Sequence, residues 1–376
     1  MKILITGGAG FIGTHTAHAL HAAGHEVRIL DILDPQVHGE TPSFPESLTR
    51  IAECVRGDVR DSAHCTRALQ EMDCIYHFAA RTGVGQSMYD ISDYASTNVV
   101  GTAALIEATL KTGAALKRFV LSSSRAVYGE GLFHCQVHGI VHPSPRDPRA
   151  MRNGDFAMHC PHCDKTMSAL PTPENCPLEP LSVYAISKKQ QEEYCQYAER
   201  TFRLPLITLR YFNVFGSLQS LRNPYTGVAS IFYSLLRDGQ PLSLYERGLP
   251  LRDFVHVSDV VRANVLVLNE KVPAGSVFNV GTGLAKTIGD IAKAQAEAMG
   301  VDAVLEDRGE YRVGDIYSCY ADISHSKQVL GYAPQVDLIA GMREFVAWAD
   351  GQASTNLYDK SVGELRAYGL FGQVAG

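Results

Sequence analysis

The sequence predicts an α/β fold, a doubly wound parallel sheet followed by a smaller mixed α/β lobe. Apolar runs of strand length alternate with helix-like stretches up to about residue 210, and this alternation predicts parallel strands joined by helices. The first run, 3–5, enters a glycine-rich turn at 7–13, and a helical pattern follows over 14–23. A strand, a glycine turn and a helix in this order are typical of a Rossmann-type domain.

The remaining elements follow the same two periodicities. Strands are expected at 26–30, 54–56, 74–78, 117–122 and 206–210, and helices over 99–111 and 184–202. Beyond residue 210 the pattern is mixed, with helices expected over 228–238, near 259–270 and over 287–299, and a hairpin-like stretch over 242–251. We therefore expect a Rossmann domain over 1–210 with an insertion at 131–180, a substrate lobe over 211–350, of which 252–270 is a candidate to pack against the Rossmann domain, and a C-terminal tail over 351–376.

The composition argues against some classes of function. The chain has 376 residues, a net charge of −6 and 45% hydrophobic residues, an ordinary globular composition that gives no reason to expect nucleic acid as a partner. Its apolar stretches are all too short to cross a bilayer. A core-like strand directly follows Met1 and Lys2, so no signal peptide is expected. We expect a cytoplasmic protein without a membrane partner.

The glycine turn and the strand after it indicate a bound dinucleotide. Gly7 permits a chain reversal at positive φ, Gly10 lets the backbone approach a pyrophosphate, and Gly13 lets the helix pack on the strand. Asp31 ends the second strand, 18 residues after Gly13 (31 − 13). Its carboxylate suits the ribose hydroxyls and repels a 2′-phosphate, which favours NAD over NADP. The further candidates in this region are Phe11, Ile12, Asp58, Val59, Phe78, Ala79, Ala80 and Asn98.

Two fragments carry the candidate chemistry. Ser124 closes a serine triplet at the carboxyl end of the strand predicted at 117–122, where active residues collect in such sheets. Tyr184 and Lys188 are four residues apart and share one face of the predicted helix. An ammonium group beside a phenol lowers the phenol pKa, so we expect Tyr184 to act as a base near neutral pH, with Lys188 also placed to bond the nicotinamide ribose. Ser124 is then expected to hold the substrate hydroxyl.

Together these motifs resemble the nucleotide-sugar epimerases among the extended short-chain dehydrogenases/reductases. The resemblance covers most of the chain apart from the insertion, and it includes the segments 83–87, 210–213, 252–257 and 312–315. It implies that Ser124 is the catalytic serine of the triplet, and that Ser122, Tyr184, Lys188 and Phe212 contact a tightly bound NAD. It also implies that carbon 4 of a nucleotide sugar is oxidised and then reduced on the opposite face, and that the protein is a homodimer joined by a helix bundle.

The same resemblance implies a set of substrate contacts. Arg252 and Arg312 match contacts to the pyrophosphate and ribose, where cationic donors are needed. A surface ion pair is the alternative for each arginine. The full set of implied substrate contacts is Ser87, Ser124, Asn213, Arg252, Arg312 and Asp315.

One departure from the family pattern bears on the reaction. Related dehydratases and decarboxylases place an acid beside the catalytic hydroxyl residue, whereas this chain has Arg125 and Ala126 there. Neither serves as a general acid, which favours simple redox at carbon 4 over dehydration. The resemblance favours dTDP-L-rhamnose as the substrate and dTDP-6-deoxy-L-talose as the product. UDP-glucose or a UDP-N-acetylhexosamine as substrate, a ketoreductase, and a non-catalytic NAD-binding regulator stay open.

A long insertion separates the two catalytic fragments, because Ser124 and Tyr184 are 60 positions apart (184 − 124). Two ligand pairs within it, with 21 residues between the pairs, have the spacing of a structural zinc site; these ligands are Cys135, His138, Cys160 and Cys163. The substitutes for these ligands are His142, His159, His162 and Cys176, and an ordered loop with free thiols is the alternative to a metal site. The insertion is expected to roof the sugar pocket.

Overall fold

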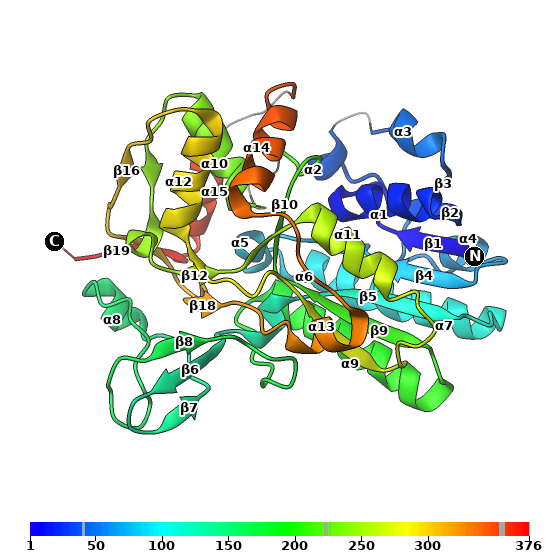
Figure 1. The fold of residues 1–376 in the computed structure, drawn as a ribbon, viewed down its shortest axis with the longest axis horizontal. Helices are drawn as coiled ribbons and strands as arrows, with labels where there is room; N and C mark the ends of the chain where they lie inside the picture. The colour runs from blue at the N-terminus through cyan, green and yellow to red at the C-terminus, as the bar shows by residue number, and fades with distance from the viewer. Residues whose placement is uncertain (40–41, 222, 224, 226, 353–357, 376) are drawn as a thin grey trace.

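The computed structural model describes residues 1–39, 42–221, 223, 225, 227–352 and 358–375. In this part of the chain, seven parallel strands form one sheet in the order β14-β9-β5-β4-β1-β2-β3, with helices on both faces (Figure 1). The strands are β1 (Lys2–Thr6), β2 (Glu26–Asp31), β3 (Ala52–Arg56), β4 (Cys74–His77), β5 (Arg118–Ser124), β9 (Leu206–Tyr211) and β14 (Ser276–Val280). The strand order reverses between β1 and β4, which opens a crevice at the carboxyl ends of the strands. The predicted doubly wound sheet is confirmed.

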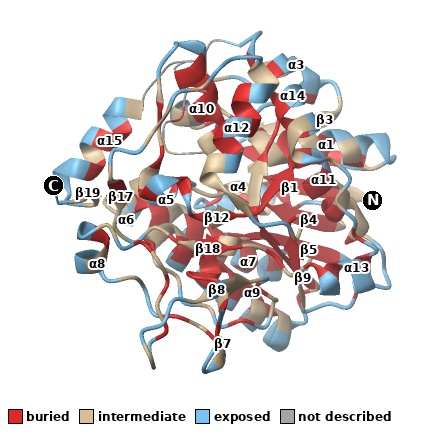
Figure 2. Cartoon of the chain, turned by 60° about the vertical axis from the view of Figure 1, so that its left-hand side comes forward, coloured by how far each residue is buried: buried red, intermediate tan, exposed pale blue. Residues whose placement is uncertain are grey.

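Helices bury each face of the sheet with apolar side chains. On one face α1 (Phe11–Ala22) packs beside α11 (Val257–Leu266), and on the other lie α4 (Ser62–Ala68), α7 (Gly101–Thr112) and α9 (Val183–Phe202). Figure 2 shows the strands buried beneath these helices. Shorter helices line the edges; they are α2 (Pro35–His38), α3 (Glu46–Thr49), α5 (Val84–Ser87), α6 (Ile91–Tyr94) and α13 (Ser324–Leu330). A π-helical stretch, Ala95–Val100, joins α6 to α7.

A second lobe has its own core between three helices. These helices are α10 (Val228–Arg237), α12 (Ile288–Met299) and α14 (Leu338–Ala349), and their apolar faces meet around Phe232, Ile291 and Phe345. Small sheets lie at the margin of this lobe. Two of them have two strands each, β10 (Asn213–Phe215) with β13 (Phe254–His256) and β11 (Leu242–Ser243) with β16 (Leu305–Glu306). A third has three strands, with β12 (Leu251–Arg252) between β15 (Lys286–Thr287) and β18 (Ser318–Cys319).

The hairpin expected over 242–251 does not form. β11 pairs in parallel with β16, whereas β12 pairs with β15 and β18. Between them Glu246 and Arg247 have φ values of 51° and 58°. Residues other than glycine rarely adopt this left-handed conformation, and here it sends the two strands to different partners.

The sheet of the first domain also includes chain from beyond residue 210. β14 pairs with β9, with Phe278 opposite Leu209, and α11 contributes Val260 and Ala263 to the core beneath the sheet. The candidate packing of 252–270 against the first domain is therefore present in α11. The expected division at residue 210 leaves out β14, a strand that the sequence patterns did not indicate.

The insertion and the tail are both folded against the rest of the chain. Within the insertion, β6 (Leu132–Cys135) pairs antiparallel with β7 (Gly139–Val141) and β8 (Ser168–Leu170), and α8 (Pro148–Arg152) follows β7. Part of the expected tail, 353–357 and 376, lies outside the described residues.

The described part of the tail reaches both lobes. It forms α15 (Tyr358–Ala367) and β19 (Phe371–Gln373), which pairs with β17 (Glu310–Arg312). The Tyr89 hydroxyl donates to Glu364 of α15 over 2.6 Å. Within the described ranges, helices of sufficient length and apolar character to span a membrane are absent.

Candidate active site

The glycine turn has the close contacts that a dinucleotide site needs. Gly7 has a φ of 70°, and a Cβ there would lie 2.6 Å from the backbone nitrogen of Ala79. A Cβ on Gly13 would lie 2.5 Å from the carbonyl oxygen of Gly7. Only glycine fits either position, so the N-terminus of α1 is left open to a pyrophosphate. The Asp31 carboxylate at the end of β2 accepts hydrogen bonds from the backbone nitrogens of Ala9 (2.9 Å) and Leu33 (2.8 Å), which fixes it beside the turn.

Most of the other predicted cofactor residues lie at the same edge. Phe78, Ala79 and Ala80 directly follow β4, Asp58 and Val59 follow β3, and Phe212 follows β9. Phe11 and Ile12 begin α1, next to Gly10. These residue types and positions fit an NAD molecule lying across the carboxyl ends of the strands.

Asn98, one of the predicted cofactor residues, joins two parts of the protein by hydrogen bonds. Its amide oxygen accepts from the Arg81 nitrogen over 2.7 Å, and its amide nitrogen donates to Ser187 of α9 over 2.8 Å. The side chain is fully buried. Asn98 therefore fixes the loop after β4 to the helix that carries Tyr184 and Lys188.

The serine triplet at the end of β5 divides its contacts among three partners. The Ser122 carbonyl accepts a hydrogen bond from the Lys188 ammonium over 2.8 Å. Ser123 donates to Glu192, which is buried in an ion pair with Arg210. Ser124 ends β5, where its hydroxyl accepts a hydrogen bond from the backbone nitrogen of Ala126 over 3.2 Å and acts to lower the pKa of the buried Tyr184 phenol. The structure thus brings the three predicted catalytic residues, Ser124, Tyr184 and Lys188, together at one strand end.

The electrostatics of Tyr184 combine burial with two neighbouring groups. Burial raises the pKa of Tyr184, while the Ser124 hydroxyl and the positive charge of Arg125 act to lower it. Burial also lowers the pKa of Lys188 to about 8, and its ammonium group donates to the Ser122 carbonyl. Arg125 is a further cation that acts on the phenol.

A buried neutral histidine lies on β4, the strand next to the serine strand β5. His77 is hydrogen-bonded with Thr6 (2.7 Å) and Thr102 (2.8 Å), and Ser122 donates to its carbonyl oxygen. Burial, together with the charge of Lys188, lowers the pKa of His77 to about 3. In the unfolded chain the His77 imidazole binds a proton below its ordinary pKa of about 6.5, whereas the folded state disfavours this protonation.

Acid is expected to destabilise the protein through His77. As the pH falls below about 6.5 the unfolded state takes up the proton first, so stability is present above this pH and is lost toward about pH 3. Between about pH 7 and pH 5 the loss should be about 2 kcal/mol. Urea unfolding at both pH values measures it, and a His77→Gln variant should lose this part of the pH dependence. An identical pH dependence in wild type and variant would contradict the prediction.

Arginines from both lobes gather beside the catalytic residues. Arg252 is 4% exposed and pairs with Asp315 over 3.1 Å, and Arg312 lies on the ring of Tyr245 at 4.8 Å from the ring centre. Arg125 donates to Asn213 over 2.8 Å. Among the described residues, Nη1 of Arg125 and Nε of Arg312 are buried without a hydrogen-bond partner. Burial and the neighbouring Arg252 lower the pKa of Arg125 to about 10. Clustered cations with unused donors are suited to a diphosphate.

Ser87 does not present a free hydroxyl to this space. It is fully buried in α5 and donates to the Val84 carbonyl over 2.7 Å. The other predicted substrate residues form one group around Arg125. Arg125 donates to Asn213, and Arg252 donates to Asp315. The charges of Arg312 and Arg125 also act on Asp315, and Ser124 directly precedes Arg125. The sequence analysis considered Arg125 only as the residue that replaces the acid of related dehydratases. Its position next to Ser124 was the signal that could have identified it as a site residue.

The four predicted metal ligands meet in the insertion. The ligand atoms of Cys135, His138, Cys160 and Cys163 all lie within 4.8 Å of one another. Sγ of Cys135 is 3.6 Å from Sγ of Cys163, and Nδ1 of His138 is 3.4 Å from Sγ of Cys160. The backbone N–H of Val137 donates to Cys135, and this hydrogen bond lowers the pKa of that thiol to about 6. A cluster of three thiols and an imidazole with these separations fits a tetrahedral metal ion.

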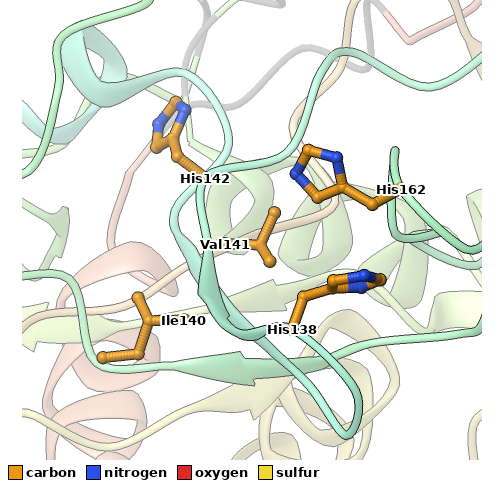
Figure 3. Close-up of a pocket in the computed structure, with 5 residues that line it drawn as sticks. All are labelled: His138, Ile140, Val141, His142 and His162. Carbon is orange, nitrogen blue, oxygen red and sulfur yellow. The ribbon is translucent and has the colours of Figure 1, made fainter.

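The expected substitutes lie outside the cluster. His159 bonds Asp155, and His142 lies 3.6 Å from Glu179. Figure 3 shows His142 and His162 with His138 around a cavity of about 490 Å³ next to the cluster. The insertion also contacts the segment that carries Arg312 and Asp315. The ring of Phe156, in the insertion, is 6.1 Å from the ring of Tyr311, which directly precedes Arg312. The insertion therefore lies beside the segment that carries Arg312 and Asp315.

The fold and the site define a dinucleotide-binding enzyme of the doubly wound α/β class, in which arginines from both lobes lie beside the predicted catalytic residues. The sequence model of the NAD dependent epimerase/dehydratase family matches residues 3–150 and 161–281. The chain therefore belongs to this family.

Three known proteins illustrate the similarity. The chain is 37% identical to a dTDP-L-rhamnose 4-epimerase of Burkholderia thailandensis, over 92% of this chain and 94% of that protein. The UDP-glucose 4-epimerase of Thermotoga maritima, solved with UDP-glucose, has a TM-score of 0.75 and 29% identity, over 93% and 99% of the chains. The UDP-glucuronic acid 4-epimerase of Bacillus cereus, solved with UDP-glucuronic acid and NAD, has a TM-score of 0.76 and 26% identity, over the same shares.

Proposed function

We propose that the protein is an NAD-dependent nucleotide-sugar 4-epimerase that interconverts dTDP-L-rhamnose and dTDP-6-deoxy-L-talose. The convergence of Tyr184, Ser124 and Lys188 beside the arginine cluster carries the proposal. The identity of 37% to a dTDP-L-rhamnose 4-epimerase supports this sugar nucleotide over UDP-glucose or a UDP-N-acetylhexosamine.

The catalytic residues have separate tasks in this proposal. Bound NAD would supply the acceptor and then the donor for a hydride at carbon 4. Tyr184 takes the proton from the 4-hydroxyl and gives it back after the sugar has turned over, and Ser124 holds that hydroxyl in place. Lys188, fixed on the Ser122 carbonyl, orients the nicotinamide ribose. Arg125 supplies the positive charge that favours the ionised phenol.

The residues beside Ser124 support epimerisation over dehydration. Elimination requires an acid next to the sugar, and Arg125 instead holds a fixed positive charge and donates to Asn213. A ketoreductase would use the same tyrosine, and it is distinguished by its consumption of reduced cofactor. A non-catalytic NAD-binding regulator would have no need of the convergent Tyr184 and Lys188.

The substrate proposal is tested with a panel of dTDP- and UDP-sugars. Purified protein without added cofactor should invert carbon 4 of dTDP-L-rhamnose over many turnovers, with no net change in NADH, because the redox step is reversed in each cycle. Nuclear magnetic resonance of the product reads the configuration. Conversion of UDP-glucose but not dTDP-L-rhamnose would reject the substrate, and net NADH consumption would favour the reductase.

We further propose structural zinc in the insertion and a homodimer in the cytoplasm. The geometry of the cluster formed by Cys135, His138, Cys160 and Cys163 supports the zinc site. Exposed apolar side chains around α7 and α9, namely Val100 (54%), Leu110 (39%) and Ile186 (44%), support a contact with a second copy through these helices. A monomeric mass in sedimentation equilibrium would contradict the dimer.

A further inference from the structure

The insertion reaches the second lobe through one buried arginine. Arg146 lies between β7 and α8, and its side chain is 5% exposed. Its guanidinium forms two hydrogen bonds with Glu246, and it also donates to the carbonyl oxygen of Asp315 over 2.9 Å. It lies over the ring of Tyr317 at 5.2 Å from the ring centre. One side chain of the insertion therefore touches two segments of the second lobe at once.

Both segments contact arginines that are predicted to bind the diphosphate. Asp315 belongs to the turn that follows Arg312 and pairs with Arg252. Glu246 follows Tyr245, whose ring lies against Arg312. Since Glu246 has a φ of 51°, this backbone is in a conformation that needs support from its surroundings. The Arg146 guanidinium supplies that support and joins the two segments.

Arg146 also balances two buried negative charges. Glu246 is 1% exposed, and Glu130, which lies 3.8 Å from Arg146, is 2% exposed. Glu130 accepts hydrogen bonds from the backbone nitrogens of Tyr317 and Ser318. Without the guanidinium, two carboxylates beside the arginine cluster would lack their cation and would repel a diphosphate.

The metal cluster fixes the ends of the loop that carries this arginine. Cys135 and His138 precede Arg146, and Cys160 and Cys163 follow it. A metal that joins the two pairs closes the intervening loop and removes much of its conformational freedom. The docked position of Arg146 therefore depends on the closure of the loop at the cluster.

We propose that Arg146 is a positioning residue for the nucleoside diphosphate, and that the metal-held insertion sets the affinity for the sugar nucleotide through it. This inference rests on the proposed function, because it concerns the same substrate site. It assigns the insertion to substrate affinity and leaves the chemistry at carbon 4 to the residues of the first domain.

Titrations with dTDP and, separately, UDP test the inference without turnover. Wild-type protein should bind at least one of them, and Arg146→Met should weaken that binding by about tenfold or more. Arg146→Lys keeps the charge but loses the paired hydrogen bonds, so its affinity should lie between those of wild type and Arg146→Met. With the sugar nucleotide, Arg146→Met should raise KM by a similar factor and change kcat less than about twofold. Arg149 is exposed on α8 in the same insertion, so Arg149→Met is the matched control and should bind with wild-type affinity.

A double variant tests the link to the metal cluster. Cys160→Ser alone should weaken binding of the same nucleoside diphosphate, and adding Arg146→Met should weaken it little further, because both changes act through one contact. Additive losses would overturn the coupling. If Arg146→Met and Arg146→Lys bind as tightly as wild type, the positioning role is overturned. A wild-type protein that binds neither dTDP nor UDP would instead reject the proposed function.

Discussion

Replacing Tyr184 with phenylalanine is expected to reduce kcat by about a thousandfold or more, because the proton of the 4-hydroxyl loses its acceptor. The ring and its edge-on contact with Tyr94, at 6.5 Å between ring centres, are preserved in this variant. NAD content and the unfolding temperature should therefore stay close to wild type. Initial rates with the sugar nucleotide identified by the panel, alongside the NAD content of the purified protein, measure both effects.

The control for this prediction lies on the same helix. Tyr197 is 55% exposed on α9, away from the serine strand, so Tyr197→Phe should retain wild-type kcat. Ser124→Ala should lose less activity than Tyr184→Phe, since it removes a hydroxyl that lowers the pKa of the phenol rather than the proton acceptor itself. Tyr184→Phe with activity near wild type would exclude this tyrosine as the base.

Loss of one cysteine of the cluster is expected to remove the metal and open the insertion. Purified wild-type protein should contain about one zinc per chain, and Cys160→Ser should contain little, because three ligands hold zinc far more weakly than four. Around the metal ligands the insertion buries a small apolar group that includes Cys135, Val141 and Cys160. Without the metal, a protease should cut the variant within the insertion while the remaining chain stays resistant.

Cys54→Ser is the matched control for the metal experiment. Cys54 lies in β3, distant from the four clustered ligands, and it should keep the full zinc content. A chelator should reproduce the pattern of Cys160→Ser in wild-type protein. A metal-free wild-type preparation with a protease-resistant insertion would contradict the zinc site and favour the alternative of an ordered loop with free thiols.

Local patterns in the sequence predicted the parts of the site that depend on short spacings. The glycine turn requires particular residues within seven positions, and Tyr184 and Lys188 are placed by one turn of a helix. The paired ligands of the metal cluster are likewise defined by their spacing within each pair, so the closeness of Cys135 to Cys163, at 3.6 Å, agrees with the prediction.

Contacts between distant segments account for what the sequence did not predict. β14 is short and contains Asn279, a polar residue that local patterns place in a loop. Its amide is satisfied by the hydroxyl of Tyr128 and the carbonyl of Thr172, more than a hundred residues away. Arg146 in a polar segment has the pattern of a solvated side chain, and only the folded chain reveals Glu246 opposite it. The raised pKa of Tyr184 depends in the same way on packing that no spacing encodes.

The pairing of β19 with β17 places Phe371 opposite Arg312, an arginine proposed to bind the substrate. This arginine therefore has its final surroundings only after the segment 371–373 has been synthesised. The dinucleotide turn at 7–13 comes far earlier in the chain. We therefore expect cofactor capture to precede substrate competence during synthesis.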